Sequence, residues 1–198
     1  MNSQATPERG ALRREIRAQR RALSERERSL RSHALCVNLA RCGLLLRAQR
    51  IACFWPNDAE VDLSALFPRL WQSGKRVYLP VIDGPRLWFA PMHPWTRLAD
   101  NRFGIPEPMV RRREQCPLLA LDIVLMPLVA FDGRGNRLGM GGGYYDRTFA
   151  WRAQRTHLRR PLLIGAAFAF QRRDHVDARA WDVALDAAIT DAGLEWLR

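Results

Sequence analysis

The amino-acid sequence predicts an α/β fold, with a largely parallel or mixed sheet flanked by helices and with basic helices at the N-terminus. Short apolar runs that favour buried strands alternate along the chain with helical patterns, which is typical of such sheets. The length of 198 residues suits one domain. Because we find no internal repeat, low-complexity tract or long linker, we expect residues 1–198 to form a single domain.

Two helices are predicted at the N-terminus. The first covers residues 8–23 and groups apolar side chains near one face, namely Leu12, Ile16 and Leu23. Ser24 followed by Glu27 is a capping-box pattern. It predicts the start of a second helix that runs to about Arg47.

The rest of the chain supplies the sheet and further helices. Apolar runs predict strands over residues 51–55, 76–80, 86–90, 122–126, 162–168 and 187–190. Apolar side chains at helical spacing predict a helix that Asp62 begins and Gly74 ends. Another helix is expected from about Tyr144 to Gln154. Residues 91–117 are rich in proline and arginine, and we expect them to be irregular.

The composition excludes several classes of protein. No apolar run approaches the roughly 18 residues that span a bilayer, and the N-terminus has no stretch of signal-peptide type, so we expect a cytoplasmic protein. The four cysteines have neither a CxxC pattern nor regular spacing, and the four histidines have no metal-ligand spacing. A disulfide framework and a zinc site are therefore not expected.

The net charge of +12 is concentrated near the N-terminus. Residues 1–50 contain twelve arginines and four glutamates, or +8. Such charge suits nucleic acid, a membrane surface or a polyanionic small molecule, so a basic nucleic-acid-binding protein is one interpretation. Lys75 is the sole lysine, however, and arginine stands where many proteins use lysine. Most N-terminal arginines are therefore expected on a solvated helical face.

The segment from Asp132 to Asp146 is the least ordinary in the chain. Its six glycines fall within eleven residues, between a predicted buried strand and a predicted helix. Glycine permits positive φ and a close approach of backbone N–H groups to a ligand, and a helix N-terminus favours anions. Arg134 and Arg137 add charge suited to phosphate oxygens. The segment predicts a phosphate-binding loop, with a purely structural glycine loop as the alternative.

This segment matches neither common nucleotide motif. It lacks the Gly-Lys-Ser/Thr ending of a Walker A loop. From Gly139 onward, Gly-x-Gly is followed by Gly-Gly-Tyr, whereas a dinucleotide fingerprint requires x-x-Gly. The reaction type does not follow from the loop alone.

In full, Phe131-Asp-x-x-Gly-x-Arg-Leu-Gly-x-Gly-x-Gly-Tyr-Tyr-Asp-Arg147 resembles the signature of the 5-formyltetrahydrofolate cyclo-ligases, also called 5,10-methenyltetrahydrofolate synthetases. Other segments follow in that family's order, namely Leu12-Arg13, Glu60-Val61-Asp62, Gly104-Ile-Pro-Glu-Pro108, Trp181-Asp182 and Ile189-Thr190. The resemblance covers almost the whole chain and implies a single-domain α/β fold.

The resemblance also implies a reaction. ATP phosphorylates the formyl oxygen of 5-formyltetrahydrofolate, the N10 amine attacks the activated carbon, and phosphate leaves. The products are 5,10-methenyltetrahydrofolate, ADP and inorganic phosphate. Because phosphorylation turns a poor leaving group into a good one, catalysis requires mostly positioning and charge neutralisation. An alternative is a relative that keeps the phosphate loop and acts on another small molecule.

By the same resemblance, individual residues acquire roles. ATP would be bound by Arg9, Gly10, Ala11, Leu12, Arg13, Arg137, Leu138, Gly139, Met140, Gly141, Gly142, Gly143, Tyr144 and Tyr145. The folate would be bound by Trp55, Glu60, Met140, Gly141, Gly142, Gly143 and Tyr144. Arg137 and Tyr145 would be catalytic, and Asp146 and Asp182 would hold Mg²⁺. Arg9 departs from the lysine common in the family, and we expect its guanidinium to serve instead.

The predicted sheet lets these separated residues converge. Glu60, the glycine-rich segment and Asp182 each follow a predicted strand. If those strands are parallel, the loops after them leave one carboxyl edge, where open α/β sheets bind ligands. We expect ATP and a folate as small-molecule partners, no nucleic acid, no membrane, and a monomer.

Overall fold

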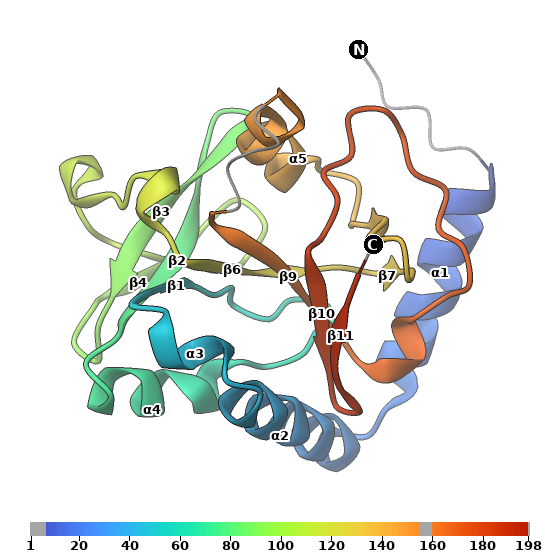
Figure 1. Ribbon diagram of the computed structural model, residues 1–198, viewed down its shortest axis with the longest axis horizontal. Helices are drawn as coiled ribbons and strands as arrows, with labels where there is room; N and C mark the ends of the chain where they lie inside the picture. Colours follow the sequence, from blue (N-terminus) through green and yellow to red (C-terminus); the bar gives the residue numbers. More distant parts are fainter. Residues whose placement is uncertain (1–6, 155–159, 198) are drawn as a thin grey trace.

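The computed structural model describes residues 7–154 and 160–197. Its centre is a seven-stranded sheet in the order β11-β10-β9-β6-β1-β2-β3 (Figure 1). These strands are β1 (Arg50–Ala52), β2 (Arg76–Asp83), β3 (Arg86–Met92), β6 (Ile123–Pro127), β9 (Leu162–Ala166), β10 (Ala187–Thr190) and β11 (Gly193–Trp196). The five inner strands are parallel, and β3 and β11 pair antiparallel at the two edges. The predicted α/β fold with a largely parallel sheet is confirmed.

The inner strands are buried on both faces. In β6, Ile123 and Leu125 belong to one apolar cluster, whereas Val124 and Met126 belong to another on the opposite face. The first cluster includes side chains of α2 (Glu25–Arg41), α3 (Leu44–Arg47) and α4 (Phe67–Gln72). The second includes Phe149 of α5 (Tyr144–Phe149). Helices therefore cover both faces, as Figure 1 shows.

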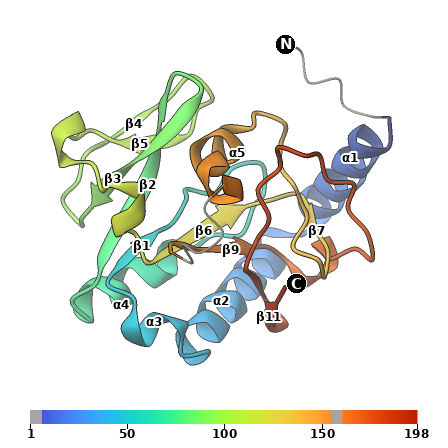
Figure 2. The same ribbon diagram turned by 45° about the horizontal axis from the view of Figure 1, so that its top comes forward.

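Helix α1 (Pro7–Ala22) lies beside the sheet and packs on a small hairpin (Figure 1 and Figure 2). The hairpin pairs β7 (Ala130–Phe131) with β8 (Arg137–Leu138). Ile16 of the helix is fully buried in a cluster with Ala130 and Leu138. The hairpin also divides the glycine-rich segment, which we predicted as one loop. Residues 132–136 form its turn, and residues 139–143 lead into α5.

The predicted N-terminal helices need one correction. Ser24 and Glu27 form the expected capping box, with reciprocal N–H···O bonds of 3.2 and 2.9 Å. Helix α2 nevertheless ends at Arg41, and not near Arg47. Gly43 has a φ of 79°, a left-handed conformation that terminates a helix, and α3 begins after it.

Other boundaries also differ from the prediction. The helix expected from Asp62 begins as a 3₁₀ turn (Ser64–Leu66) before α4, and the helix expected to reach Gln154 leaves α-geometry after Phe149. The segment expected to be irregular contains a hairpin of β4 (Leu98–Asp100) and β5 (Pro106–Pro108). Short 3₁₀ turns also occur, namely η2 (Arg112–Glu114), η3 (Leu118–Ala120), η4 (Ala150–Gln154) and η5 (Ala169–Gln171). The edge strand β11 was not predicted.

The structure bears on two expectations that were drawn from composition, namely those about membrane spans and about disulfides. No helix within residues 7–154 and 160–197 has the length and apolar character needed to cross a membrane. The four cysteines are free thiols. The expectation about a signal peptide concerns in part residues 1–6, which lie outside the described residues. His157, one of the four histidines, also lies outside them.

Gly135 fixes the β7–β8 turn against the segment before β10. Its φ is 81°, its carbonyl accepts a hydrogen bond from the Leu185 N–H at 2.9 Å, and an added Cβ would lie 2.6 Å from the Leu185 carbonyl oxygen. We predict that Gly135→Ala lowers the free energy of unfolding by about 2–4 kcal/mol, because backbone strain adds to overpacking. Urea denaturation would measure this loss.

Gly74→Ala is the matched control for that substitution. Gly74 has a similar φ of 70°, but an added Cβ would meet no atom within 4 Å. The control should lose only about 1 kcal/mol, from strain alone. Equal losses of unfolding free energy in the two variants would show that the contact with Leu185 does not contribute to the destabilisation.

Candidate active site

A cavity of about 570 Å³ opens at the carboxyl edge of the parallel strands. Its walls include Trp55, which follows β1, and Pro127, which ends β6. Open α/β sheets bind ligands at this edge. Glu60, the second half of the glycine-rich segment and Asp182 all line the same cavity. The structure thus brings together loops that are far apart in the sequence.

Most of the residues with predicted roles line this cavity. They are Arg9, Arg13, Trp55, Glu60, Arg137, Gly139, Met140, Gly141, Gly142, Gly143, Tyr144, Tyr145, Asp146 and Asp182. Four residues predicted to bind ATP do not line it, namely Gly10, Ala11, Leu12 and Leu138. The reason is helical and strand periodicity: Arg9 and Arg13 share one face of α1, and Leu138 points from β8 into the apolar cluster behind the wall.

One wall of the cavity is basic. Arg13 donates from Nε to the Gly139 carbonyl at 2.8 Å, which ties α1 to the glycine-rich segment. Burial, together with the charges of Arg9 and Arg179, lowers the pKa of Arg13. Arg9 is itself buried and forms a 2.8 Å ion pair with Asp182. The wall therefore concentrates positive charge that carboxylates partly balance.

A second ion pair joins β8 to α5. Arg137 is 4% exposed and contacts Asp146 Oδ1 at 2.5 Å. The buried Nε of Arg137 has no hydrogen-bond partner among the residues that the structure describes. Asp146 Oδ1 also accepts the Val183 N–H at 3.1 Å. Because Val183 follows Asp182 directly, the two predicted metal ligands lie on adjoining parts of one wall.

The chemistry of these carboxylates fits Mg²⁺ shared with phosphate. Mg²⁺ takes one or two protein carboxylates and completes its shell with phosphate oxygens and water. The ion pairs above use Oδ1 of Asp146 and Oδ2 of Asp182, so each carboxylate has a second oxygen. No group of three or more His, Cys, Asp or Glu side chains suited to a metal occurs within the described ranges. A metal here would therefore depend on oxygens from a ligand.

Another part of the lining is apolar and aromatic. Trp55 and Ile82 come from the β1 and β2 region, and Phe103 comes from the β4–β5 hairpin. Phe103 meets the ring of Tyr144 edge-on, with centroids 6.3 Å apart, and Arg102 donates a hydrogen bond to the Tyr144 hydroxyl. The hairpin within residues 91–117 therefore supplies a wall that the proline- and arginine-rich sequence did not reveal.

Two titratable groups are buried beside this lining. Burial raises the pKa of Glu60 to about 7, although the Arg20 charge and the Asn57 N–H act in the opposite direction. The Tyr145 hydroxyl is buried and has no hydrogen-bond partner among the described residues. Burial and the Glu60 charge raise the pKa of Tyr145, so its phenol stays neutral and remains a donor.

Comparisons with known proteins identify the family. The model of the 5-formyltetrahydrofolate cyclo-ligase family matches residues 5–191. The chain belongs to this family. It is 37% identical over 186 residues to the 5-formyltetrahydrofolate cyclo-ligase of Escherichia coli (strain K12), covering 91% of this chain and 100% of that protein. The Haemophilus influenzae protein of that name is 39% identical over 177 residues, covering 87% and 90%.

A solved structure supports the same assignment. The NMR structure of Aquifex aeolicus 5,10-methenyltetrahydrofolate synthetase matches with a TM-score of 0.80 and 32% identity, covering 96% of this chain and 93% of that one. The family inferred from the motif between Phe131 and Arg147 is therefore confirmed. The expectation that the protein is an enzyme of this family is confirmed as well.

The sequence did not reveal every residue of the site. No role was predicted for Arg20 or Asp58, although Arg20 lies within ion-pair distance of both Asp58 and Glu60. A signal for Arg20 was present in the sequence, because it stands four positions after Ile16, in line with the predicted apolar face of its helix. A charged residue at a core-facing position has a buried partner or a function.

Glu60 should make the stability of the protein depend on pH. Its pKa of about 7 in the folded protein lies above the ordinary value of 4.5, so its favourable contribution is complete below pH 4.5 and is lost as pH rises to 7. We predict that Glu60→Gln, neutral throughout, raises the free energy of unfolding by up to about 3 kcal/mol near pH 8. Thermal denaturation of both proteins near pH 8 and pH 4.5 would measure it. A gain that is equal at the two pH values would contradict the raised pKa.

Proposed function

We propose that this protein uses ATP to convert 5-formyltetrahydrofolate to 5,10-methenyltetrahydrofolate, within a single domain. The observation that carries the proposal is one cavity that combines a basic wall and glycine backbone with an aromatic wall beside a buried carboxylate. A nucleotide phosphate chain suits the first, and a flat pterin ring suits the second. Membership of the cyclo-ligase family supports the same pairing of ligands.

Arginines of the basic wall would bind the phosphates. Arg9 and Arg13 reach the cavity from α1, and Arg137 reaches it from β8. Gly141 and Gly143 have φ of 112° and 64°, conformations that turn the intervening backbone tightly along the wall. Because α5 has only six residues, these charges matter more than the helix dipole on which the prediction relied.

The proposed reaction transfers the γ-phosphoryl group of ATP to the formyl oxygen, and the bond to ADP breaks. The N10 amine then attacks the formyl carbon, inorganic phosphate leaves with that oxygen, and N10 loses its proton. Arg137 would neutralise charge on the transferred group, and its unpaired buried Nε is a donor available for this purpose. The Tyr145 hydroxyl is a second such donor.

The folate would lie against the aromatic wall. Trp55 provides a flat surface for the pterin, with Met140 and Tyr144 also exposed to the cavity. An ionised Glu60 is an acceptor for ring N–H groups, since a carboxylate accepts hydrogen bonds on both oxygens. Asp146 and Asp182 would hold Mg²⁺, which neutralises phosphate charge when bound.

Ion pairs reduce the free charge on part of the basic N-terminal segment, which weakens the nucleic-acid interpretation. Of the N-terminal arginines, Arg9, Arg17, Arg20, Arg21 and Arg31 are engaged in ion pairs with carboxylates. A phosphate-loop relative with another acceptor remains the second candidate, because the cavity alone does not name the folate. The monomeric state and a cytoplasmic location stay predictions.

Turnover tests the proposal directly. Purified protein incubated with 5-formyltetrahydrofolate, ATP and Mg²⁺ should produce the near-ultraviolet absorbance of the methenyl product, with phosphate released in equal amount. Omitting ATP should abolish both signals. Folded protein without ATP-dependent turnover would refute the proposed function, and salt-sensitive binding to arbitrary RNA in its place would favour the nucleic-acid interpretation.

Asp146→Asn tests the proposed metal role. The amide keeps an oxygen for Arg137 and Val183 but lacks the charge, so we predict that turnover at limiting Mg²⁺ falls at least about tenfold while the fold persists. Titration of activity with Mg²⁺ would measure the shift. Asp186→Asn is the control, because Asp186 pairs with Arg152 at 2.8 Å and does not line the cavity. The same Mg²⁺ dependence in both variants would remove Asp146 from the metal site.

A further inference from the structure

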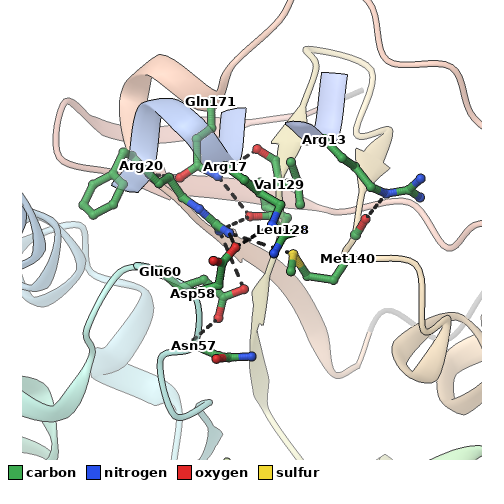
Figure 3. Close-up of polar contacts among 12 residues, drawn as sticks. Arg13, Arg17, Arg20, Asn57, Asp58, Glu60, Leu128, Val129, Met140 and Gln171 are labelled. Atoms are coloured by element: carbon green, nitrogen blue, oxygen red, sulfur yellow. Dashed lines mark hydrogen bonds and ion pairs between the residues drawn. The ribbon is translucent and has the colours of Figure 1, made fainter. Parts of the chain in front are cut away.

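The carboxylate of Asp58 contacts three arginines of helix α1, and Figure 3 shows two of them, Arg17 and Arg20. Arg17 and Arg21 donate from Nε to its two oxygens at 2.6 Å each, and Arg20 donates from Nη2 at 3.0 Å. Arg20 and Arg21 lie three and four positions after Arg17, so both are neighbours of Arg17 on the helix surface. The Asp58 side chain is only 9% exposed. This cluster joins α1 to the loop after β1.

The cluster holds that loop in an unusual conformation. Asp58 and Ala59 have φ of 50° and 58°, and two successive non-glycine residues in the left-handed region persist only when their surroundings fix them. Glu60 follows directly, with its backbone N–H bonded to the Asn57 carbonyl at 3.0 Å. The position of Glu60 is therefore set by this turn, and Arg20 is the buried arginine among the three that contact it.

Arg20 is the member of the cluster that also reaches Glu60. Its side chain is 1% exposed, and its Nη1 lies 3.7 Å from Glu60 Oε1 (Figure 3). The same guanidinium contacts the Leu128 carbonyl at 3.5 Å and the Met140 sulfur at 3.9 Å. A charge buried this deeply requires carboxylate partners, and Asp58 and Glu60 supply them.

We propose that Arg20 is a positioning residue, which orients the Glu60 carboxylate toward the cavity and favours its ionised form, because its guanidinium is the ion-pair partner of that carboxylate. The inference rests on the proposed function, in which Glu60 binds the folate. Arg20 itself does not line the cavity, so it acts through Glu60.

The charges that face Glu60 predict opposite effects for two substitutions. Arg20 is the positive neighbour, Asp58 the negative one, and the Tyr145 phenol faces it from α5. Burial raises the pKa of Glu60 to about 7 even with Arg20 present, so loss of Arg20 should raise it further. Loss of the Asp58 charge should lower it, and it also leaves Glu60 as the remaining carboxylate for Arg20.

The experiment measures 5-formyltetrahydrofolate binding and kcat/KM as functions of pH. Tryptophan fluorescence reports binding without turnover. In Arg20→Met, the acidic limb of both profiles should move up by about one to three pH units, and the folate KM at pH 7 should rise about tenfold or more. Arg20→Lys keeps the charge and should restore most of the limb. Asp58→Asn should move the limb down.

Arg17→Met is the matched control. Arg17 contacts the same Asp58 oxygen as Arg20. Among the described residues, however, the ion pair with Glu60 is formed by Arg20 and not by Arg17. The acidic limb of this variant should coincide with that of the parent protein, and its folate KM should stay within about twofold. A loss of structure common to all cluster variants would affect Arg17→Met as well, which separates positioning from folding.

Each outcome bears on one claim. An unshifted limb in folded Arg20→Met, or an equal shift in Arg17→Met, overturns the positioning role. If Arg20→Met does not fold, Asp58→Asn decides, because a limb that fails to move down also overturns it. A folded parent protein that does not turn over 5-formyltetrahydrofolate refutes the proposed function itself, whereas an active parent with unshifted variants refutes only this inference.

Discussion

The site depends on charges that helix α1 carries inward. Most amphipathic helices turn an apolar stripe toward the core, but α1 lies beside the sheet and packs on the β7–β8 hairpin through a small cluster around Ile16. Its inward face continues with Arg9, Arg13 and Arg20, which bond to Asp182, the Gly139 carbonyl and Asp58 respectively. The helix is therefore held by polar contacts that need carbonyls and carboxylates at fixed places. Those places are the loops around the cavity.

Such an arrangement is not the most stable way to attach a helix. Burying an ion pair costs desolvation that its attraction only partly recovers, and apolar side chains of similar size often give equal or greater stability. Arg20 is fully buried, and its Nε has no partner among the residues described. The raised pKa of Glu60 has the same meaning, since the folded protein holds this carboxylate at a cost. Under the proposed function, binding of the ligands would account for these costly contacts, because perturbed pKa values cluster at functional sites.

The sequence was sufficient for the features that local chemistry decides. The capping box at Ser24, the strand at Ile123 and the left-handed Gly74 are all short-range patterns, and each is present. The convergence of the glycine-rich segment, Glu60 and Asp182 on one cavity followed from parallel strands, which share one carboxyl edge. These inferences need no knowledge of distant contacts.

The features that were missed depend on distant partners. Gly43 ends α2 early through its left-handed conformation. A glycine beside an apolar run does not by itself predict the end of a helix. The β4–β5 hairpin has two prolines in one of its strands, which argues against a strand until the opposite strand is known. Arg20 resembled a solvated arginine of a basic helix. Only the fold shows that Asp58, thirty-eight positions later, lies against it.

The two ion pairs on the basic wall also explain how this site stays stable before any ligand binds. Burial, together with the charges of Arg9 and Arg179, lowers the pKa of Arg13, and without carboxylates these arginines would repel one another. Asp182 offsets this charge through Arg9, and Asp146 does the same for Arg137. Under the proposed function, each pair joins a predicted phosphate ligand to a predicted metal ligand. ATP and Mg²⁺ bring negative and positive charge to the same wall, so both sets of side chains can exchange partners without leaving a buried charge uncompensated. The pairing that stabilises the free protein thus uses the groups that its ligands would engage.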